Sequence, residues 1–398
     1  MRKVLYVSSV CSEEVLKFIF TTAKVKPQLA AQKFHRLLAE GFAQNHGDCD
    51  IKTLSTIPVV PANHSKKIWK LPQQKVKKVK YNYIPMVNIR GVKNLGIFIY
   101  TFLYVFFWSL FATKKKSVVC DLLNVTVSIA SMVACKLTGV KIVAIVTDLP
   151  GLMVDAKKSR NEPNTPIVTK RLTWFDGYII LTEQMNQIIN PNNKPYMVME
   201  GLVDSHMQKS SNELKNKYPN KTILYAGGLF EKYGLKTLIE AFKLVKDPSY
   251  QLHLYGLGEM VENMADYIAD DKRIKYLGVV PNEKVVAEQI KVSLLVNPRP
   301  TQEEFTKYSF PSKNMEYMVS GTPIVTTKLP GMPAEYNNYV YLFDDESIQG
   351  MSGKIGEVLE KSAKELHDFG SDSKSFVLKK KNNSVQAKRI LNFLDNAF

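Results

Sequence analysis

Residues 297–327, NPRPTQEEFTKYSFPSKNMEYMVSGTPIVTT, contain the signals that decide the fold of this chain. The apolar run before them predicts a strand, and residues 324–327, IVTT, predict a second, buried strand. Between the strands, a serine cap within residues 309–312 and the proline among them predict a helix that begins near position 311. Gly321, followed by Pro323, predicts the end of that helix. The stretch therefore predicts a strand–helix–strand unit of an α/β fold.

The start of this predicted helix combines groups that suit an anion. Lys313 and Glu316 lie three positions apart, and hence on one face of the helix. The free N–H groups and the dipole of a helix start attract negative charge. We expect the backbone at Ser309 and Ser312, together with Lys313, to bind the phosphates of a nucleotide diphosphate. Glu316 is then placed to accept hydrogen bonds from two ribose hydroxyls.

With its surroundings, the stretch resembles the retaining sugar-nucleotide glycosyltransferases of the two-Rossmann-domain (GT-B) type, often called family 4 or group 1. Those enzymes carry two glutamates eight positions apart, the second on the helix before a small-Gly-x-Pro strand. Glu316 and residues 320–323, SGTP, match the second half of this motif. Tyr308 stands at the first position, and the nearest acids are Glu303 and Glu304, so these three residues are candidates to contact the donor sugar. The Pro-Ser-Lys form of the motif resembles bacterial capsule and exopolysaccharide enzymes.

Three further segments resemble motifs of the same family, in the same order. The first is a glycine loop at residues 226–234, in which a diphosphate can approach the backbone. Relatives usually carry Arg and Lys where this chain has Gly228 and Tyr233, so we expect Lys232 to supply the charge. The glycine loop adds Gly227, Gly228 and Lys232 to the expected nucleotide-sugar site. The second segment, residues 255–259, adds Gly256 and Gly258. The third, residues 276–282, adds Val280 and lines the base pocket in relatives.

The reaction that the resemblance implies places negative charge on a leaving diphosphate. Fixed N–H groups and cations stabilise such charge best. We expect Lys313, Lys232 and Arg299 to do this without a metal ion. In the first half of the chain, Asp148 follows a predicted strand at a place where relatives often carry a His-Asp pair. Asp148 either orients the acceptor or donor sugar or caps the next turn.

Strand and helix patterns alternate along the whole chain, as in a doubly wound α/β protein. Predicted strands in the first half are residues 3–7, 50–54, 117–121, 141–146 and 178–181. The pattern restarts in the second half with strands 222–226, 251–255 and 274–277 and helices 235–245, 260–270 and 282–290. We expect two Rossmann-like domains facing across a cleft: an acceptor-side domain (1–195), a nucleotide-sugar domain (196–373), and a helix (374–398) that crosses back.

The positive charge of the chain, formally +17, is concentrated in one segment. Between Asp50 and Asp121 there are twelve lysines, one arginine and no acidic residue. Within it, an apolar run at residues 97–112 is shorter than the ~20 residues of a spanning helix. Segment 65–116 therefore predicts an interfacial anchor on an anionic membrane, with Phe102, Phe106 and Trp108 entering the lipid. The alternative is a core helix with a solvated lysine rim. No nucleic-acid motif accompanies the charge, so nucleic acid is not an expected partner.

Neither a metal site nor a disulfide framework is indicated. The four cysteines show no CxxC spacing, which fits free thiols in the cytosol. The N-terminal apolar run is short and predicts a first strand instead of a signal peptide. Asp48 and Asp50 have the spacing of a paired-aspartate metal motif, but they stand at the entry to a strand, where aspartate is a common turn residue.

The resemblance thus implies a retaining, metal-independent glycosyltransferase with no cofactor beyond its co-substrate, a nucleotide-diphosphate sugar of the UDP or GDP type. The expected acceptor is a lipid-linked or other glycan of a bacterial surface polysaccharide, at the cytoplasmic face of the membrane. One alternative is a non-catalytic partner subunit of the same fold, for which the missing first glutamate argues. The other is a nucleotide-sugar epimerase or phosphorylase. Turnover assays with and without an acceptor separate the three.

Overall fold

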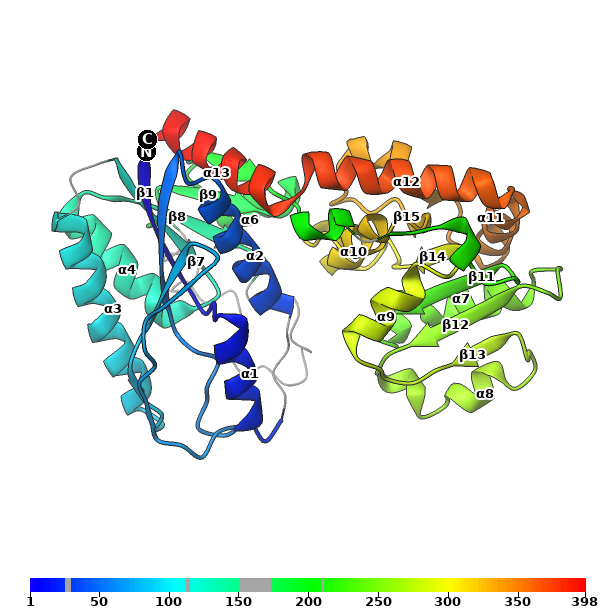
Figure 1. The fold of residues 1–398 in the computed structure, drawn as a ribbon, viewed down its shortest axis with the longest axis horizontal. Helices are drawn as coiled ribbons and strands as arrows, with labels where there is room; N and C mark the ends of the chain where they lie inside the picture. The colour runs from blue at the N-terminus through cyan, green and yellow to red at the C-terminus, as the bar shows by residue number, and fades with distance from the viewer. Residues whose placement is uncertain (26–29, 112–114, 150–172, 210) are drawn as a thin grey trace. The chain divides into compact units, whose positions relative to one another are not determined.

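Figure 1 shows the computed structural model, which describes residues 1–25, 30–111, 115–149, 173–209 and 211–398. The chain folds into two compact units. The first contains Met1–Leu202 and Asn383–Phe398, and the second contains Val203–Asn382. The first unit therefore extends beyond the predicted boundary at residue 195, and only the last part of the predicted crossing helix, from Asn383, belongs to it. The predicted α/β architecture with Rossmann-like domains is confirmed.

An eight-stranded sheet forms the centre of the first unit. Within the described residues its neighbouring strands are parallel, except for an antiparallel pair at one edge. The five predicted strands are present, each with ends within one residue of the prediction, because strands buried on both faces read as continuous apolar runs. In sheet order the strands are β10 (Tyr196–Val198), β9 (Gly177–Ile180), β8 (Lys141–Val146), β7 (Lys116–Asp121), β1 (Arg2–Ser8), β2 (Cys49–Ser55), β5 (Val79–Tyr83) and β4 (Gln74–Val76).

Helices pack on this sheet, and the first and last residues of the chain lie side by side (Figure 1). Arg2 forms an ion pair with Asp395 at 2.9 Å. A Cβ on Gly41 would collide with the carbonyl of Asn383, so a glycine is required where the second and last helices cross. The helices are α1 (Glu13–Thr21), α2 (Ala30–Gln44), α3 (Val92–Phe111), α4 (Val125–Thr138), α6 (Glu183–Ile189) and α13 (Asn383–Ala397).

The lysine-rich segment folds into strands before it reaches α3. Four strands form here: β3 (Ile68–Trp69), β4, β5 and β6 (Met86–Val87). None of them is among the predicted strands. In β5 the alternating residues Val79, Tyr81 and Tyr83 are buried, while Lys80 between them is half-buried. Strands β4 and β5 therefore belong to the eight-stranded sheet, whereas β3 and β6 pair with each other in a separate two-stranded sheet.

The second unit contains a six-stranded parallel sheet. Its strands are, in order, β13 (Ile274–Tyr276), β12 (Gln251–Tyr255), β11 (Thr222–Ala226), β14 (Leu294–Asn297), β15 (Ile324–Thr327) and β16 (Tyr341–Phe343). Ile223 and Tyr225 join one buried apolar cluster and Leu224 another, as expected for successive residues on opposite faces of a strand. The sheet is therefore covered on both faces.

Helices of the second unit follow the predicted pattern with two exceptions. The predicted helix 374–398 is not continuous, because its first part is the end of α12 (Ala363–Lys380) and a new helix, α13, begins at Asn383. Predicted helix 260–270 is split into a 3-10 turn, η4 (Glu259–Val261), and a short helix, α8 (Met264–Ile268). The other helices are α7 (Leu235–Lys243), α9 (Asn282–Gln289), α10 (Ser312–Ser320), α11 (Ile348–Glu360) and α12 (Ala363–Lys380). The other 3-10 turns are η1 (Ser205–Lys209), η2 (Leu214–Asn216), η3 (Glu231–Tyr233), η5 (Glu304–Lys307) and η6 (Ala334–Tyr339).

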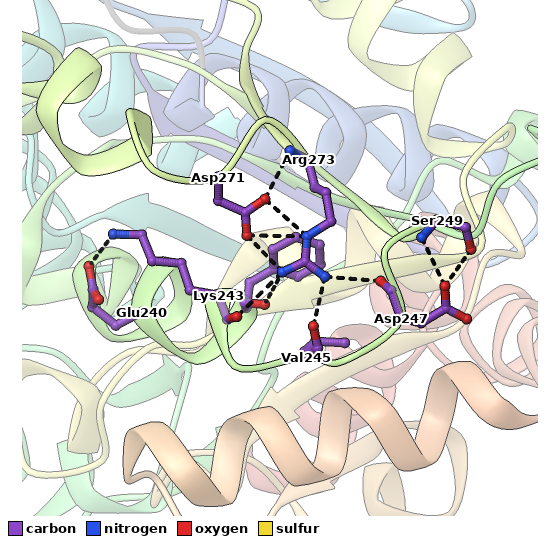
Figure 2. Close-up of polar contacts among 8 residues, drawn as sticks. Glu240, Lys243, Val245, Asp247, Ser249, Asp271 and Arg273 are labelled. Atoms are coloured by element: carbon purple, nitrogen blue, oxygen red, sulfur yellow. Dashed lines mark hydrogen bonds and ion pairs between the residues drawn. The ribbon is translucent and has the colours of Figure 1, made fainter.

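Arg273 joins three segments of this unit, as Figure 2 shows. Its guanidinium donates to both carboxylate oxygens of Asp271 and to the carbonyl oxygens of Val245 and Asp247. It also lies over the ring of Phe242 at 5.0 Å from the centroid. The hydrogen bond from Arg273 lowers the pKa of the Asp271 carboxyl. One planar cation therefore fixes the end of α7 against the start of β13.

We expect Arg273→Ala to lower the free energy of unfolding of this unit by ~2–3 kcal/mol, the usual size for hydrogen bonds to charged groups, because Asp271 is left half-buried without its main donor. Arg273→Lys should recover only part of this, since an ammonium group cannot reproduce the planar fork. The exposed neighbour Lys272, changed to Ala, is the matched control. Chemical denaturation that shows equal stability for Arg273→Ala and Lys272→Ala would contradict the assignment.

Candidate functional site

Helix α10 positions the predicted anion-binding residues. It begins at Ser312 and ends at Ser320, and the next residue, Gly321, with a φ of 79°, is the predicted left-handed cap. The predicted serine cap is wrong: Pro311 is the N-cap residue, and no side chain caps the helix. The Ser309 hydroxyl donates to the carbonyl oxygen of Phe305 at 3.0 Å instead. The first N–H groups of α10 are therefore not satisfied by a cap side chain of its own.

Tyr317 fixes α10 against the end of β11. Its hydroxyl accepts a hydrogen bond from the N–H of Ala226 at 2.8 Å and donates to the carbonyl oxygen of the same residue at 3.2 Å. Lys313 lies four positions earlier, on the same face of the helix. The side chain of Lys313 is therefore directed to the loop that follows β11.

The amine of Lys313 lies 3.8 Å from the ring centroid of Tyr225. Its Nζ atom also occupies the space that a side chain at position 227 would fill, because a Cβ on Gly227 would collide with it. Burial, together with the positive charge of Arg299, lowers the pKa of the Lys313 amine to about 7, and the charge of Glu316 opposes this shift. The structure thus holds a cation whose charge a bound anion would favour.

Arg299 lies between two aromatic rings. Its guanidinium is 4.9 Å from the centroid of Tyr233 and 5.3 Å from that of Phe305. The exposed Lys232 lies 5.7 Å from Phe230 and 5.8 Å from Tyr233. Aromatic faces hold cations without neutralising them. Tyr233, which stands where relatives have a lysine, therefore supports two positive side chains in place of that charge.

The glycine loops are explained by close approach of backbone to backbone. A Cβ on Gly256 would collide with the carbonyl of Gly227, and one on Gly258 with the carbonyl of Leu229. The N–H of Gly227 donates to Tyr255 at 2.9 Å. Gly256 and Gly258 therefore support the loop after β11. At Gly228, a Cβ would lie 2.8 Å from the Phe230 ring, so a side chain at this position would require that ring to shift.

Glu316 is oriented by the neighbouring helix. Gln289, at the end of α9, donates from Nε2 to a Glu316 carboxylate oxygen at 3.1 Å. The backbone of Gln289 is in turn fixed by the hydroxyl of Thr322, which donates to its carbonyl oxygen at 2.7 Å. A carboxylate held in this way keeps capacity for further hydrogen bonds.

The remaining predicted residues are distributed more widely. Glu304 is exposed on η5, and Tyr308, at the end of η5, is half-buried. Ser312 is exposed at the first position of α10, and Val280 packs on the edge of the apolar core. Asp148 follows β8 in the first unit and is half-buried. Pro150 and Gly151, which complete its predicted motif, lie outside the described residues.

The sequence did not point to three groups that build this site: Tyr225, Phe305 and Gln289. Each acts by positioning a charged side chain that was predicted. Alternate residues of a strand point to the same side, so Tyr225 is expected beside the predicted site residue Gly227, and this spacing could have indicated Tyr225. Phe305 and Gln289 contact their partners through the fold, and no local pattern indicates them.

Asp48 and Asp50 both have lysine partners. The Lys388 amine, 2.6 Å from Asp48, holds the pKa of that carboxyl below its usual value. Asp50 forms an ion pair with Lys80 at 3.8 Å. Within the described ranges, no group of three or more His, Cys, Asp or Glu side chains is placed to hold a metal ion.

Residues 206–376, which include all of the second-unit site, match the family model of Glycosyl transferases group 1. The chain is a glycosyltransferase. A sequence comparison of the glycosyltransferase with curated proteins finds no match.

Solved structures show that the glycosyltransferase has the GT-B fold. It is similar to the lipopolysaccharide outer core galactosyltransferase WaaB, with a TM-score of 0.62 and 14% identity over 100% of both chains. It is also similar to sucrose-phosphate synthase from Thermosynechococcus elongatus, with a TM-score of 0.65 and 12% identity over 100% of this chain and 99% of that one. For HepE from Anabaena, in complex with UDP, the TM-score is 0.61 and the identity is 12%, over 99% of this chain and 100% of that one. At these identities the likeness concerns the fold.

The contact between Gly227 and Lys313 can be tested directly. In Gly227→Ala the new methyl group must displace the flexible end of Lys313, so we expect donor affinity to fall about tenfold or more, equal to ~1.4 kcal/mol, with the fold retained. The control is Gly353→Ala on α11, where a Cβ has no neighbour within 4 Å. Nucleotide titrations read beside melting curves check this, and unchanged affinity in a folded Gly227→Ala variant would refute the contact.

Proposed function

We propose that the protein transfers a sugar from a UDP- or GDP-linked donor to a glycan acceptor, with retention of configuration and without a metal ion. The observation that carries the proposal is the placement of Lys313 between the Tyr225 ring and Gly227, where burial and the charge of Arg299 lower the pKa of its amine. Two cations in a half-buried site, beside a glycine loop and a helix start, suit a diphosphate.

In the proposed reaction the bond between the anomeric carbon and the diphosphate oxygen breaks. A new bond forms to an acceptor hydroxyl oxygen, and the hydroxyl proton is released. Lys313 and Arg299 stabilise the charge that grows on the diphosphate. Since the pKa of Lys313 is about 7 without a ligand, the bound diphosphate favours its protonated form. Glu316, oriented by Gln289, binds the ribose hydroxyls.

Support for a diphosphate donor comes also from the proteins of similar fold. HepE from Anabaena is a UDP complex, and one TarM structure contains UDP with a glycosylated glycerol. Asp148 and the residues near Glu304 and Tyr308 are the proposed contacts of the sugars. The role of the missing first glutamate falls to one of the latter two.

We further propose that the acceptor is a lipid-linked glycan of a bacterial capsule or exopolysaccharide, and that the protein binds the inner face of the membrane through α3. Among the described helices, α3 is the one long and apolar enough to cross a membrane by length and composition. Leu95, Ile99 and Leu110, on its outer side, are 62%, 49% and 53% exposed. Lysines precede and follow the helix. An exposed apolar face with a basic surround suits an interfacial helix on anionic lipid.

Changing Lys313 to Ala should lower kcat more than donor affinity, because leaving-group charge is largest in the transition state. Glu316→Gln should instead weaken nucleotide binding by ~1.5–3 kcal/mol. Lys284→Ala, an exposed change on α9, is the control. The measurement is transfer from UDP and GDP sugars to a lipid-linked glycan, repeated with excess chelator. Conversion of the donor without an acceptor would favour an epimerase or phosphorylase, and chelator-sensitive activity would overturn metal independence.

The membrane proposal predicts that the protein sediments with anionic vesicles, and that binding weakens with salt, since surface attraction is screened over about 8 Å at physiological ionic strength. Replacing Leu95, Ile99 and Leu110 with Ser should abolish sedimentation without unfolding, because these side chains are exposed. Leu137, Leu244 and Leu257, equally exposed elsewhere, give the matched triple Ser control. Wild-type protein that ignores anionic vesicles at low salt would eliminate this part of the proposal.

A further inference from the structure

A hollow of about 560 Å³ lies in the first unit between α3 and the strands β1 and β2. Its wall is an aromatic stripe of α3, and its floor contains polar side chains of the two strands, Lys3, Asp50 and Lys52. The wall residues are Tyr100, Leu103, Tyr104, Phe107, Trp108 and Phe111. Trp108 therefore belongs to the hollow, whereas Phe102 and Phe106 do not line it.

The hollow exists because α3 is attached along a single stripe. Its buried residues, Ile97, Thr101, Val105 and Ser109, recur every four positions and form one face. Figure 1 shows α3 side by side with α4, against which it packs closely. Small residues such as Thr101 and Ser109 let two helices approach closely. The aromatic stripe of α3 faces away from α4, and a gap remains between this stripe and the sheet.

The floor of the hollow is positively charged. Lys3 and Asp50 are paired neighbours in β1 and β2, and Lys52 is the next residue on the same side of β2. Asp50 is engaged by Lys80 at 3.8 Å. Within the described part of the chain, neither Lys3 nor Lys52 forms an ion pair. An aromatic wall above an unbalanced basic floor matches a molecule with a hydrocarbon chain and an anionic head.

We infer that this hollow binds an anionic phospholipid of the membrane, with an acyl chain along the α3 aromatic stripe and the phosphate on Lys3 and Lys52. The inference deepens the proposed membrane attachment and rests on it. The outer face of α3 then contacts the bilayer, while one lipid is held beneath the helix. The lipid completes the cover of the sheet that α3 leaves open.

The place of the hollow distinguishes this lipid from an acceptor. Lys3 and Asp50 stand near the amino ends of their strands. Ligands of open α/β sheets bind outside the carboxyl ends, where Asp148 follows β8. Along β1, the step from Lys3 to Ser8 alone covers about 17 Å at ~3.3 Å per residue. A lipid in the hollow is therefore an anchor that leaves the carboxyl edge open to the acceptor.

The test uses dioctanoyl phosphatidylglycerol below its critical micelle concentration, titrated into the full chain by calorimetry. We expect saturable binding of about one lipid per chain, and affinity about 10- to 30-fold lower for dioctanoyl phosphatidylcholine. Lys3→Gln with Lys52→Gln should give a loss of similar size. The matched control, Lys67→Gln with Lys70→Gln, removes the same charge from exposed positions of the lysine-rich segment outside the hollow.

Melting curves confirm that the variants are folded, and three outcomes would overturn the inference. Equal losses in the two double variants would mean diffuse charge attraction without a site. Vesicle binding without monomer binding would remove the hollow and leave the membrane attachment standing. Inhibition of sugar transfer that is competitive with the acceptor would make the hollow an acceptor site. A saturating lipid that leaves the transfer rate unchanged supports the anchor.

Discussion

The candidate site of the second unit depends on the pair of hydrogen bonds between the Tyr317 hydroxyl and the backbone of Ala226. These bonds fix the rotation of α10 relative to the sheet. Because Lys313 is one turn earlier on the same face, its amine is delivered to Tyr225 and to the bare backbone of Gly227. Because Gly256 and Gly258 have no side chains, the loop after β12 can pack against the loop after β11. The Tyr317 hydroxyl thus determines where the Lys313 amine contacts the glycine loop after β11.

Positive side chains of this site lie against aromatic faces. Tyr225 supports Lys313, while Tyr233 and Phe305 support Arg299. A ring attracts a cation through the negative face of its π-system. Burial, and after it the positive charge of Arg299, lowers the pKa of the Lys313 amine, so an anionic ligand would favour the protonated form of that amine.

Local signals in the sequence were sufficient for the framework and insufficient for the contacts. Buried parallel strands such as β8 and the glycine end of α10 were predicted, because apolar runs and left-handed caps are properties of a few adjacent residues. Strand β5 was missed, since lysines at its flanks hide the alternation of Val79, Tyr81 and Tyr83. The serine cap failed because the Ser309 hydroxyl has a competing acceptor, the Phe305 carbonyl, four residues earlier. The clamp around Arg299 joins η3, η5 and the loop after β14, a combination that no local pattern encodes.

The return of α13 to the first unit sets an order for folding during synthesis. Residues 203–382 are continuous, so the second unit can form as soon as it leaves the ribosome. The first unit is synthesised earlier but lacks α13, which supplies Asp395 to Arg2 and the backbone that meets Gly41. The half of the chain that is made first is therefore completed last. Until then the face of α2 at Gly41 and the start of β1 at Arg2 lack the partners that α13 supplies.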